Sequence, residues 1–430
     1  MMMPYSAYKD SKLDWLGKIP SHWDLVKLGA CFKERNEKVS DKDFAALSVT
    51  KNGILPQMEH VAKTDAGDNR KKVCIGDFVI NSRSDRKGSS GTSDYDGSVS
   101  LISIILEPRL YEPRFAHHLL RSYNFQEEFY KYGKGIVADL WSTRYSDMKN
   151  IFVPLMPIAE QKAIATFLDR ETQRIDSLIE EKQTFIKLLK EKRQALISHV
   201  VTKGLNPNVE MQDSGIEWIG QVPKHWIVRR LKHTSTLQSG IAKGKDNAGK
   251  ETLSIPMLRV ANVQDGYVKL DDVHEINVLP HEVERYALKG GDVLMNEGGD
   301  NDKLGRGTVW KEQIKPCIHQ NHVFVIRVTD IEPEWLGWLT QSSYAKFYFF
   351  RVSKQSTNLA SISSTNVKEV HLLIPPADER KIIMEYLEKQ TSKLKLLVQD
   401  VEESITLLKE HRTSLISAAV TGKIDVREAV

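Results

Sequence analysis

The 430-residue sequence has few cysteines and no long apolar run. Its three cysteines, Cys31, Cys74 and Cys317, form no CxxC pair, so neither a disulfide framework nor a structural zinc site is expected. No segment approaches the roughly 18 consecutive apolar residues of a transmembrane helix, and no cationic start precedes a long apolar stretch. We therefore expect a cytoplasmic protein with free thiols, without a signal peptide and without contact to a membrane.

The sequence also lacks the short motifs of common catalytic sites. It contains no GxxxxGK[ST] phosphate loop, no GxGxxG after a strand, no GxSxG elbow and no HExxH metal motif. The Pro-Pro pair at 375–376 is followed by Ala377, so it does not match the Asp/Asn-Pro-Pro-aromatic motif of amino-methyltransferases. No pattern of paired acids with a lysine indicates a nuclease. These absences favour a binding and scaffolding protein whose partners carry out the chemistry.

Charge of one sign is not in large excess either. The chain has 61 Lys and Arg against 57 Asp and Glu, which gives a net charge of +4 and a pI near 8.6. Spread over the whole chain, this excess produces a weak field. Nucleic-acid binding would therefore require Lys and Arg to be concentrated locally.

What the sequence does contain is an internal repeat with two conserved parts. WLGKIPSHW at 15–23 returns as WIGQVPKHW at 218–226, with five of nine positions identical. LLKEKRQALISHVVTKG at 188–204 returns as LLKEHRTSLISAAVTGK at 407–423, with ten of seventeen identical. The offsets are 203 and 219 residues, so the variable part of the second repeat is 16 residues longer. The conserved segments indicate a structural scaffold that both repeats share, and the variable segments indicate that the two repeats have different functions.

The second conserved part has the pattern of a long helix. Residues 158–201 contain neither Pro nor Gly, and apolar residues recur every three or four positions in both copies. We predict spacer helices over 157–204 and 376–422 that pack on each other in antiparallel fashion, because homologous repeats tend to associate about a twofold axis. The alternative is that each helix packs separately on its own globular domain. The predicted coiled-coil core consists of Leu168, Ile175, Leu178, Phe185, Leu189, Leu196, Leu387, Leu394, Leu397, Val401, Leu408 and Leu415.

The remaining residues predict two globular α+β domains, over 1–156 and 205–375, and a C-terminal tail over 423–430. Short strand-like runs, such as FVINS at 78–82 and HVFVIRV at 322–328, are separated by clusters of Gly, Asn, Asp and Ser. We expect the tryptophans of the repeated nonapeptide to be buried and to fix the first strand of each domain.

Two loops in equivalent places carry most of the candidate binding residues. NSRSDRKGSSGTSD at 81–94 follows GDFVIN, and NEGGDNDKLGRGTVW at 296–310 follows GDVLMN. Small residues permit close backbone approach to a ligand, and Arg can bond guanine or phosphate; the alternative is a solvated surface loop. With residues of further segments, the candidate DNA-binding set is Arg83, Arg86, Lys87, Ser89, Arg144, Lys243, Lys245, Arg259, Asn262, Lys303, Arg306 and Asn321. His319 and His322 have no Cys or carboxylate partner at metal spacing, so we expect them to form hydrogen bonds and predict no metal site.

Together these features resemble the specificity subunit of type I restriction-modification systems. The resemblance covers both repeats and nearly the whole chain. The segments that carry it are YKDSKLDWLGKIPSHWDLVKL at 8–28 and its twin QDSGIEWIGQVPKHWIVRRL at 212–231, the helix starts LMPIAEQKAIATFL at 155–168 and LIPPADERKIIMEYL at 373–387, and the helix ends LISHVVTKGL and LISAAVTGKI.

The resemblance implies two target-recognition domains, each binding one half of a split, asymmetric site on double-stranded DNA. It implies that the two helices form an antiparallel coiled coil in a pseudo-twofold molecule, which docks two methyltransferase subunits and, through the complex, restriction subunits. S-adenosylmethionine, ATP and magnesium would belong to those partners, so we expect no cofactor on this non-catalytic chain. Two rivals stay open: a coiled-coil adaptor that binds only proteins, without DNA specificity, and an enzyme with an unrecognised site.

Overall fold

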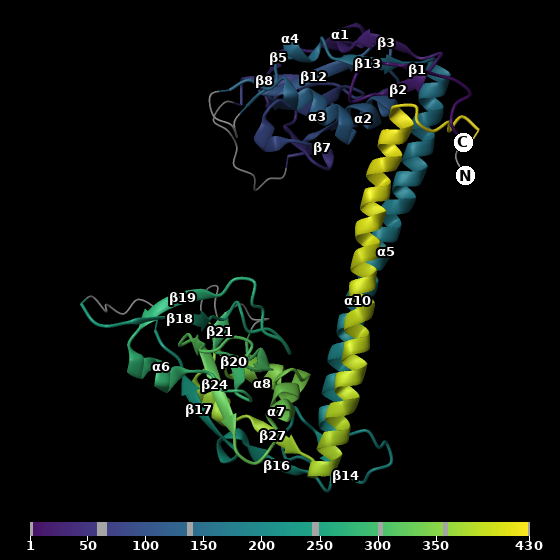
Figure 1. The fold of residues 1–430 in the computed structure, drawn as a ribbon. Helices are drawn as coiled ribbons and strands as arrows, with labels where there is room; N and C mark the ends of the chain where they lie inside the picture. Colours follow the sequence, from purple (N-terminus) through teal and green to yellow (C-terminus); the bar gives the residue numbers. More distant parts are fainter. Residues whose placement is uncertain are drawn as a thin grey trace. The chain divides into compact units, whose positions relative to one another are not determined.

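The computed structural model describes residues 3–57, 67–135, 141–242, 249–299, 304–355 and 360–428 (Figure 1). The chain divides into two compact units. The first contains Met1–Gln183 and Glu402–Val430, and the second contains Thr184–Val401. Helices and strands are mixed in both units, so the fold is α+β, as predicted.

The core of the first unit is a four-stranded antiparallel sheet with the strand order β10-β9-β12-β4. Its strands are β10 (Ser90–Thr92), β9 (Phe78–Asn81), β12 (Ser103–Pro108) and β4 (Phe32–Glu34). Every residue of β9 is buried, because this strand lies between two others. Helix α2 (Pro113–Arg121) packs on β9 and β10, and Ser122 then caps α3 (Tyr123–Lys131) by accepting a hydrogen bond from the Phe125 amide.

Smaller elements complete the first unit. A second sheet has the order β11-β8-β5, formed by Gly97–Ser100, Arg70–Val73 and Lys38–Val39. Three strand pairs follow: β1 (Tyr8–Asp10) with β2 (Lys18–Pro20), β3 (Asp24–Lys27) with β13 (Phe152–Leu155), and β6 (Leu47–Thr50) with β7 (Gly53–Pro56). The short helices are α1 (Leu28–Cys31), η1 (Ser84–Arg86) and α4 (Tyr145–Met148).

The second unit repeats the central sheet with the order β22-β20-β24-β17. These strands are β22 (Gly307–Val309), β20 (Val293–Asn296), β24 (Val323–Val328) and β17 (Ser235–Ser239). Helix α7 (Pro333–Thr340) packs on β20 and β22, and α8 (Ser343–Val352) follows it. Each element thus has a counterpart in the first unit at the same place in the topology.

The rest of the second unit differs more. Strand β18 (Leu253–Leu258) pairs antiparallel with β19 (His274–Val278) and parallel with β23 (Ile318–His319). A further sheet has the order β21-β26-β25, formed by Gly298–Gly299, Ala360–Ser361 and Lys354–Gln355. The remaining elements are the pairs β14 (Met211–Asp213) with β15 (Gln221–Pro223) and β16 (Ile227–Arg230) with β27 (His371–Ile374), and the helices η3 (Leu231–His233), α6 (Pro280–Tyr286) and α9 (Ser364–Lys368).

The matched Gly-Asp pairs of the sequence enter the central sheets through the same turn. Gly76 and Gly291 both have a φ of +87°, a backbone conformation that side chains with a Cβ rarely adopt. The following Asp77 accepts a hydrogen bond from the Cys74 amide at 2.8 Å and from Arg35 Nε at 2.7 Å. In the second unit Asp292 accepts from the Lys289 amide at 2.9 Å and from an arginine of β24. The turn is therefore a conserved way of starting the buried strand.

Two long helices run through both units. Helix α5 spans Ile158–Lys203 and α10 spans Ala377–Val420, which places their ends within two residues of the predicted bounds. In the first unit, Arg412 of α10 binds Asp176 of α5 through two hydrogen bonds of 2.9 and 3.1 Å. Gly422, just past the end of α10, lies against Trp23, which contacts the first turn of α5. The contacts within this unit therefore run in antiparallel order.

The second unit shows the same order at the other helix ends. Gly204, just past the end of α5, lies against Glu379 in the first turn of α10. Ile197 and Val201 of α5 share a hydrophobic core with Ile383 and Leu387 of α10. Within this unit the end of one helix therefore packs beside the start of the other.

The predicted core of these helices is wrong at two positions. Phe185 is 47% exposed and Leu397 is 45% exposed, whereas the neighbouring Ile186 and Val398 are half-buried. Adjacent residues of a helix point about 100° apart, and an apolar doublet does not show which of its members faces inward. Among the other predicted core residues, Leu168, Ile175, Leu189, Leu387, Leu394 and Leu415 are buried, and Leu178, Leu196, Val401 and Leu408 are half-buried.

The repeated nonapeptide anchors each domain to the start of a long helix. Trp23 is fully buried, and its indole Nε1 donates to Glu160 Oε1 of α5 at 2.9 Å. The same carboxylate accepts hydrogen bonds from the Tyr5 hydroxyl at 2.8 Å and from His22 Nε2 at 2.9 Å. A carboxylate at a helix N-terminus is also favoured by the helix dipole. The side chains of His22 and Trp23 thus connect the segment between β2 and β3 to the first turn of helix α5.

Candidate nucleic-acid interface

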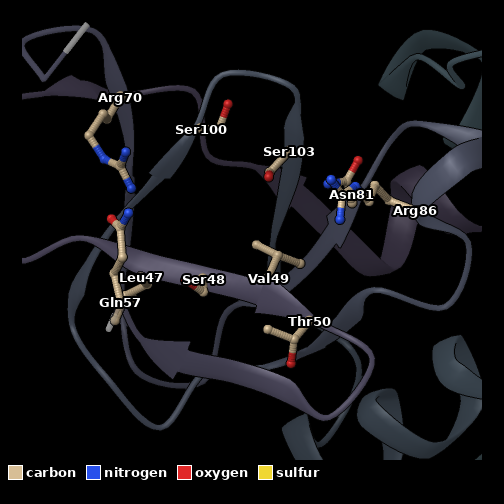
Figure 2. A pocket seen from close by; sticks show the side chains of 10 residues that line it. All are labelled: Leu47, Ser48, Val49, Thr50, Gln57, Arg70, Asn81, Arg86, Ser100 and Ser103. Atoms are coloured by element: carbon tan, nitrogen blue, oxygen red, sulfur yellow. The ribbon is translucent and has the colours of Figure 1, made fainter. Parts of the chain in front are cut away.

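The first unit has a cavity of about 330 Å³ beside its second sheet (Figure 2). Figure 2 shows Arg70 and Gln57 at one end and Asn81 and Arg86 at the other. The lining residues are Leu47, Ser48, Val49, Thr50, Gln57, Arg70, Asn81, Arg86, Ser100 and Ser103. These ten side chains include two guanidinium groups, several hydroxyls and two amides, but no carboxylate. Such a lining suits a ligand that is anionic or rich in hydrogen-bond acceptors.

The positive charge at the cavity wall is held in place by the second sheet. Arg70 is 8% exposed, and its Nε and Nη2 donate to the hydroxyl and carbonyl oxygens of Ser98, both at 2.9 Å. The neighbouring Lys71 donates from Nζ to the Ser103 carbonyl at 2.9 Å. Burial lowers the pKa of both side chains from their ordinary values. Arginine nevertheless stays protonated in proteins, so Arg70 supplies a fixed charge.

The loop after β9 brings three of the predicted arginines to the surface of this unit. Arg83 and Arg86 are exposed, and Arg86 lines the cavity. The backbone at Arg83 forms an isolated bridge with Ser142, which places the exposed Arg144 nearby in the chain. These three residues therefore remain candidates for contact with a phosphate or a base edge.

Two predicted residues of the same loop have other roles. Lys87 forms an ion pair of 2.5 Å with Glu127 of α3 and lies 5.8 Å from the Tyr130 ring, so its charge is partly neutralised. Ser89 is 5% exposed, and its carbonyl accepts from the Asn81 amide at 2.9 Å. The turn that closes the loop buries Ser89, so its contact with DNA stays a prediction that would require this turn to open.

In the second unit, Arg259 and Asn262 lie in one turn. Asn262 is 2% exposed; its Oδ1 accepts from the Arg259 amide at 2.8 Å and its Nδ2 donates to two backbone carbonyls. Arg259 forms an ion pair of 2.9 Å with Asp272. Asn262 therefore stabilises the turn through its hydrogen bonds, and its contact with DNA stays a prediction. Arg259 is 22% exposed and is engaged by a carboxylate.

The structure brings this turn close to the loop after β20. Asn296, the last residue of β20, is 1% exposed and donates from Nδ2 to the carbonyls of Val260 and Val263 at 3.2 and 3.1 Å. Arg306 is half-buried and donates from Nη1 to Gln264 Oε1 at 2.8 Å. Arg306 and residues 259–264 therefore form one surface.

Asn321 lies just before β24, next to His322, whose carbonyl accepts from the Glu297 amide at 3.0 Å. The Asn321 amide donates to the Ile241 carbonyl at 2.9 Å, and the side chain is half-buried beside His322. The predicted Lys243, Lys245 and Lys303 lie outside the described residues.

The two histidines near β24 form hydrogen bonds, as expected. His319 is 1% exposed and bonds the Val323 carbonyl through Nδ1 at 2.7 Å, while burial lowers its pKa to about 4. His322 is exposed and bonds Glu297 Oε2 at 2.7 Å. In the part of the chain that the structure describes, no group of three or more His, Cys, Asp and Glu residues could hold a metal ion.

The sequence analysis did not identify several residues outside the two predicted loops that line the cavity or contact a predicted arginine. Ser48 and Thr50 of β6 and Gln57 line the first cavity, and Gln264 contacts Arg306 in the second unit. The alternation in LSVT at 47–50 was the available signal for a strand, but it does not show which loop the strand faces. Pairing between distant segments places these side chains.

The comparisons with known proteins agree with this architecture. Residues 223–406 match the family model "Type I restriction modification DNA specificity domain". The EcoKI specificity subunit of Escherichia coli K12 is 23% identical over 95% of this chain and 90% of its own length. The StySPI specificity subunit of Salmonella potsdam is 23% identical over 82% of this chain and 76% of its own length. Residues 223–406 thus carry this specificity domain, and the chain as a whole is similar to specificity subunits of type I restriction enzymes.

Solved structures of this family share the fold. A chain from a type I restriction-modification complex superposes with a TM-score of 0.71 at 16% identity, covering 94% of this chain and 98% of the other. The HsdS subunit from Thermoanaerobacter tengcongensis gives 0.56 at 18% identity, covering 96% of this chain and 100% of the other. The curated relatives that the chain matches over most of its length are named specificity subunits of type I restriction enzymes. None of its helices in the described ranges is apolar over the length that a bilayer requires.

Proposed function

We propose that this chain is a specificity subunit that binds a split, asymmetric site on double-stranded DNA, with one half bound by each globular domain. The observation that carries the proposal is the cavity of the first unit, whose lining has Arg70 at one end, Arg86 at the other, hydroxyl and amide groups, and no carboxylate. Arginine, serine, threonine and glutamine are the side chains that bond phosphates and base edges. The two domains share a frame but differ in these residues, as two different half-sites require.

The long helices are proposed to form an antiparallel coiled coil that sets the distance between the half-sites. Helix α5 has 46 residues and is roughly 70 Å long. Half-sites on one face of the duplex are separated by about 34 Å or a multiple of it, so a spacer of this order leaves room for the reach of each domain. The local antiparallel contacts within each unit support this arrangement.

The expected partners are two methyltransferase subunits and, through them, restriction subunits. S-adenosylmethionine, ATP and magnesium are proposed to bind those partners, since the sequence has no motif for any of them. The net charge of only +4 fits partner subunits that supply part of the phosphate contact. The complex is proposed to act in the cytoplasm.

The test is co-expression with the methyltransferase subunits in a host without adenine methylation, followed by sequencing of modified adenines. We expect a bipartite motif with a gap of constant length. Combining Arg83→Ala with Arg86→Ala should lower methylation about tenfold or more, because lost phosphate or base contacts typically cost 1–3 kcal/mol each. Lys9→Ala with Lys18→Ala removes the same charge from β1 and β2 and should leave methylation unchanged.

The rival functions give different results in this assay. A protein-only adaptor would leave the genome without any modified motif, even with the methyltransferase present. An enzyme with an unrecognised site would modify or cleave DNA as the purified chain alone. Wild-type methylation that survives the double Arg variant at moderate salt would remove the first-unit loop from the proposed interface.

A further inference from the structure

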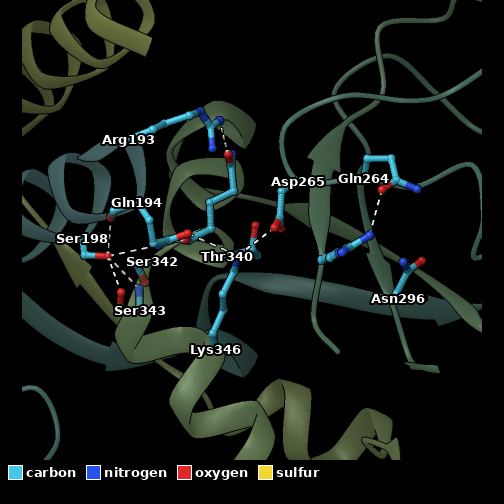
Figure 3. Close-up of polar contacts among 12 residues, drawn as sticks. Arg193, Gln194, Ser198, Gln264, Asp265, Asn296, Thr340, Ser342, Ser343 and Lys346 are labelled. Carbon is cyan, nitrogen blue, oxygen red and sulfur yellow. Dashed lines mark hydrogen bonds and ion pairs between the residues drawn. The ribbon is translucent and has the colours of Figure 1, made fainter. Parts of the chain in front are cut away.

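The second unit contains a chain of polar contacts that connects helix α5 to Arg306 (Figure 3). It involves the corner between α7 and α8, the turn at Gln264–Gly266 and the loop after β20. Figure 3 shows α5 side chains at one end and the Gln264 contact at the other. Its residues are Arg193, Gln194 and Ser198 of α5, Gln341, Ser343 and Lys346 of the corner, and Gln264, Asp265 and Arg306.

The first group of contacts joins the corner between α7 and α8 to helix α5. Arg193 Nη2 donates to Gln341 Oε1 at 2.7 Å, and Gln194 Nε2 donates to the Gln341 carbonyl. Ser198 Oγ bonds Ser343 at both its hydroxyl, at 2.9 Å, and its amide, at 2.8 Å. Arg193 is half-buried, and this burial lowers the pKa of its guanidinium. Four side-chain contacts therefore join two segments that are far apart in the sequence.

The second step fixes the turn to the corner. Lys346 Nζ donates to Asp265 Oδ2 at 2.7 Å, and both side chains are largely buried, at 33% and 25% exposure. Gly266 has a φ of +85°, and a Cβ at this position would lie 2.9 Å from Gln341 Oε1 and 3.3 Å from Arg193 Nη2. The backbone of the turn therefore lies directly against the pair formed by α5 and the corner.

The third step connects the turn to Arg306. The Gly266 amide donates to the Gly307 carbonyl at 3.1 Å, next to Arg306 in the chain. Gln264 Oε1 accepts from Arg306 Nη1 at 2.8 Å, and Gln264 Nε2 donates to the Ala261 carbonyl at 2.8 Å, which fixes the direction of the amide. The turn therefore holds the Nη1 side of the Arg306 guanidinium.

Among the described residues of the first unit, the corresponding helix position has a different partner. Arg412 corresponds to Arg193 at the repeat offset of 219, but it binds Asp176 on the paired helix. In that unit the loop after β9 is held by α3, through Lys87 and Glu127. A general stabilising role would not require the two repeats to differ in this way.

We propose that Arg193 and Asp265 are positioning residues for recognition of the second half-site, because they hold Gln264 and thereby direct Arg306 toward the DNA. The inference rests on the proposed function. A site that must be held within fractions of an ångström depends on supporting contacts of this kind. Loosening any step lets Arg306 sample other directions, which reduces discrimination between bases more than it reduces non-specific binding to phosphates.

The experiment uses the complex with its methyltransferase subunits, after its bipartite motif is known. Methylation rates are measured on the cognate site, on a site with one substitution in the half bound by the second domain, and on one with a substitution in the other half. Wild-type discrimination of roughly 5- to 150-fold per substituted base pair is expected. Gln264→Met and Arg193→Met interrupt the connection at its two ends, and each should lower discrimination in the second half about tenfold while leaving the first half unchanged.

Three further measurements keep the test decisive. Arg412→Met is the matched control at the equivalent helix position and should leave discrimination in the second half unchanged. Asp265→Glu, which keeps the ion pair, should restore most of the discrimination that Asp265→Ala removes. If Gln264→Met and Arg193→Met, folded as judged by thermal melting, keep wild-type discrimination in both halves, the inference is wrong. If the wild-type complex yields no bipartite motif, the proposed function itself fails.

Discussion

In the first unit the loop after β9 is supported from within the domain, by the ion pair of Lys87 with Glu127 of α3. In the second unit the equivalent loop after β20 is supported by Gln264, whose turn is held by α5. Both loops follow a buried strand that begins with the same Gly-Asp turn. The comparison shows that equivalent strands of the two repeats can be followed by loops that different elements hold in place.

The second sheets differ even more than the loops. In the first unit β8 pairs with β11 and β5, and a separate hairpin of β6 and β7 lines the cavity. In the second unit β18 pairs with β19 and, in parallel, with β23. The central sheet, by contrast, has the same strand order in both units. The two units therefore differ more in their second sheets than in their central sheets.

The largest expected difference concerns the two anchors of the repeated nonapeptide. Glu160 is 6% exposed and accepts from three donors, whereas Glu379 has 30% side-chain exposure and accepts from His225 and Trp226. Hydrogen bonds to a charged group contribute about 1.5–3 kcal/mol each, and buried donors left without partners add a cost. Glu160→Ala should lower the free energy of unfolding by about 4 kcal/mol and Glu379→Ala by about 1–2 kcal/mol, measured by urea denaturation.

The corresponding glutamine variants test whether charge or contact matters. Glu160→Gln keeps one acceptor oxygen and should recover part of the loss. Equal destabilisation by the two alanine variants would show that exposure at Glu379 does not weaken its anchor, contrary to this comparison.

A change in pH is expected to have an intermediate effect on the free energy of unfolding, through His319 of the second unit. Burial lowers its pKa to about 4, below the ordinary value of 6.5 that it regains on unfolding. The unfolded chain therefore takes up the proton first, and the stability contributed by the neutral histidine is lost as pH falls from about 6.5 to about 4. Between pH 7 and pH 5, this group should lower the free energy of unfolding by roughly 2 kcal/mol.

The measurement is urea denaturation at a series of pH values for the wild type and His319→Asn. Asparagine can still donate to the Val323 carbonyl but does not titrate in this range. The variant should show a smaller loss of stability on acidification than the wild type. An unchanged slope in His319→Asn would contradict the assignment.

The smallest effect is expected on the exposed face of α10. Leu394 is 8% exposed, whereas Leu397 is 45% exposed. Leu397→Gln should change the free energy of unfolding of the isolated chain by less than about 0.5 kcal/mol, while Leu394→Gln should cost about 2–4 kcal/mol. Chemical denaturation of both variants measures these changes. A large loss of stability in Leu397→Gln would show that Leu397 belongs to the helix core, as the sequence predicted.

The division into constant and variable parts could be derived from the sequence because identical residues recur at fixed offsets. The lengths of the two helices were also predictable, since Pro157 and Gly204 mark the ends of a segment without helix breakers. The inward face was not, because Phe185 and Ile186 are both apolar and adjacent. Which of them is buried depends on the partner helix.

For the candidate interface, the sequence by itself determined the equivalent positions of the two loops. Only the tertiary structure decided that Ser89 and Asn262 are buried, that β6 lines the first cavity, and that Gln264 holds Arg306. The physical reason is that polar side chains satisfy the nearest backbone groups whenever a turn brings them close. That proximity arises from pairing between segments far apart in the chain, which local sequence patterns do not record.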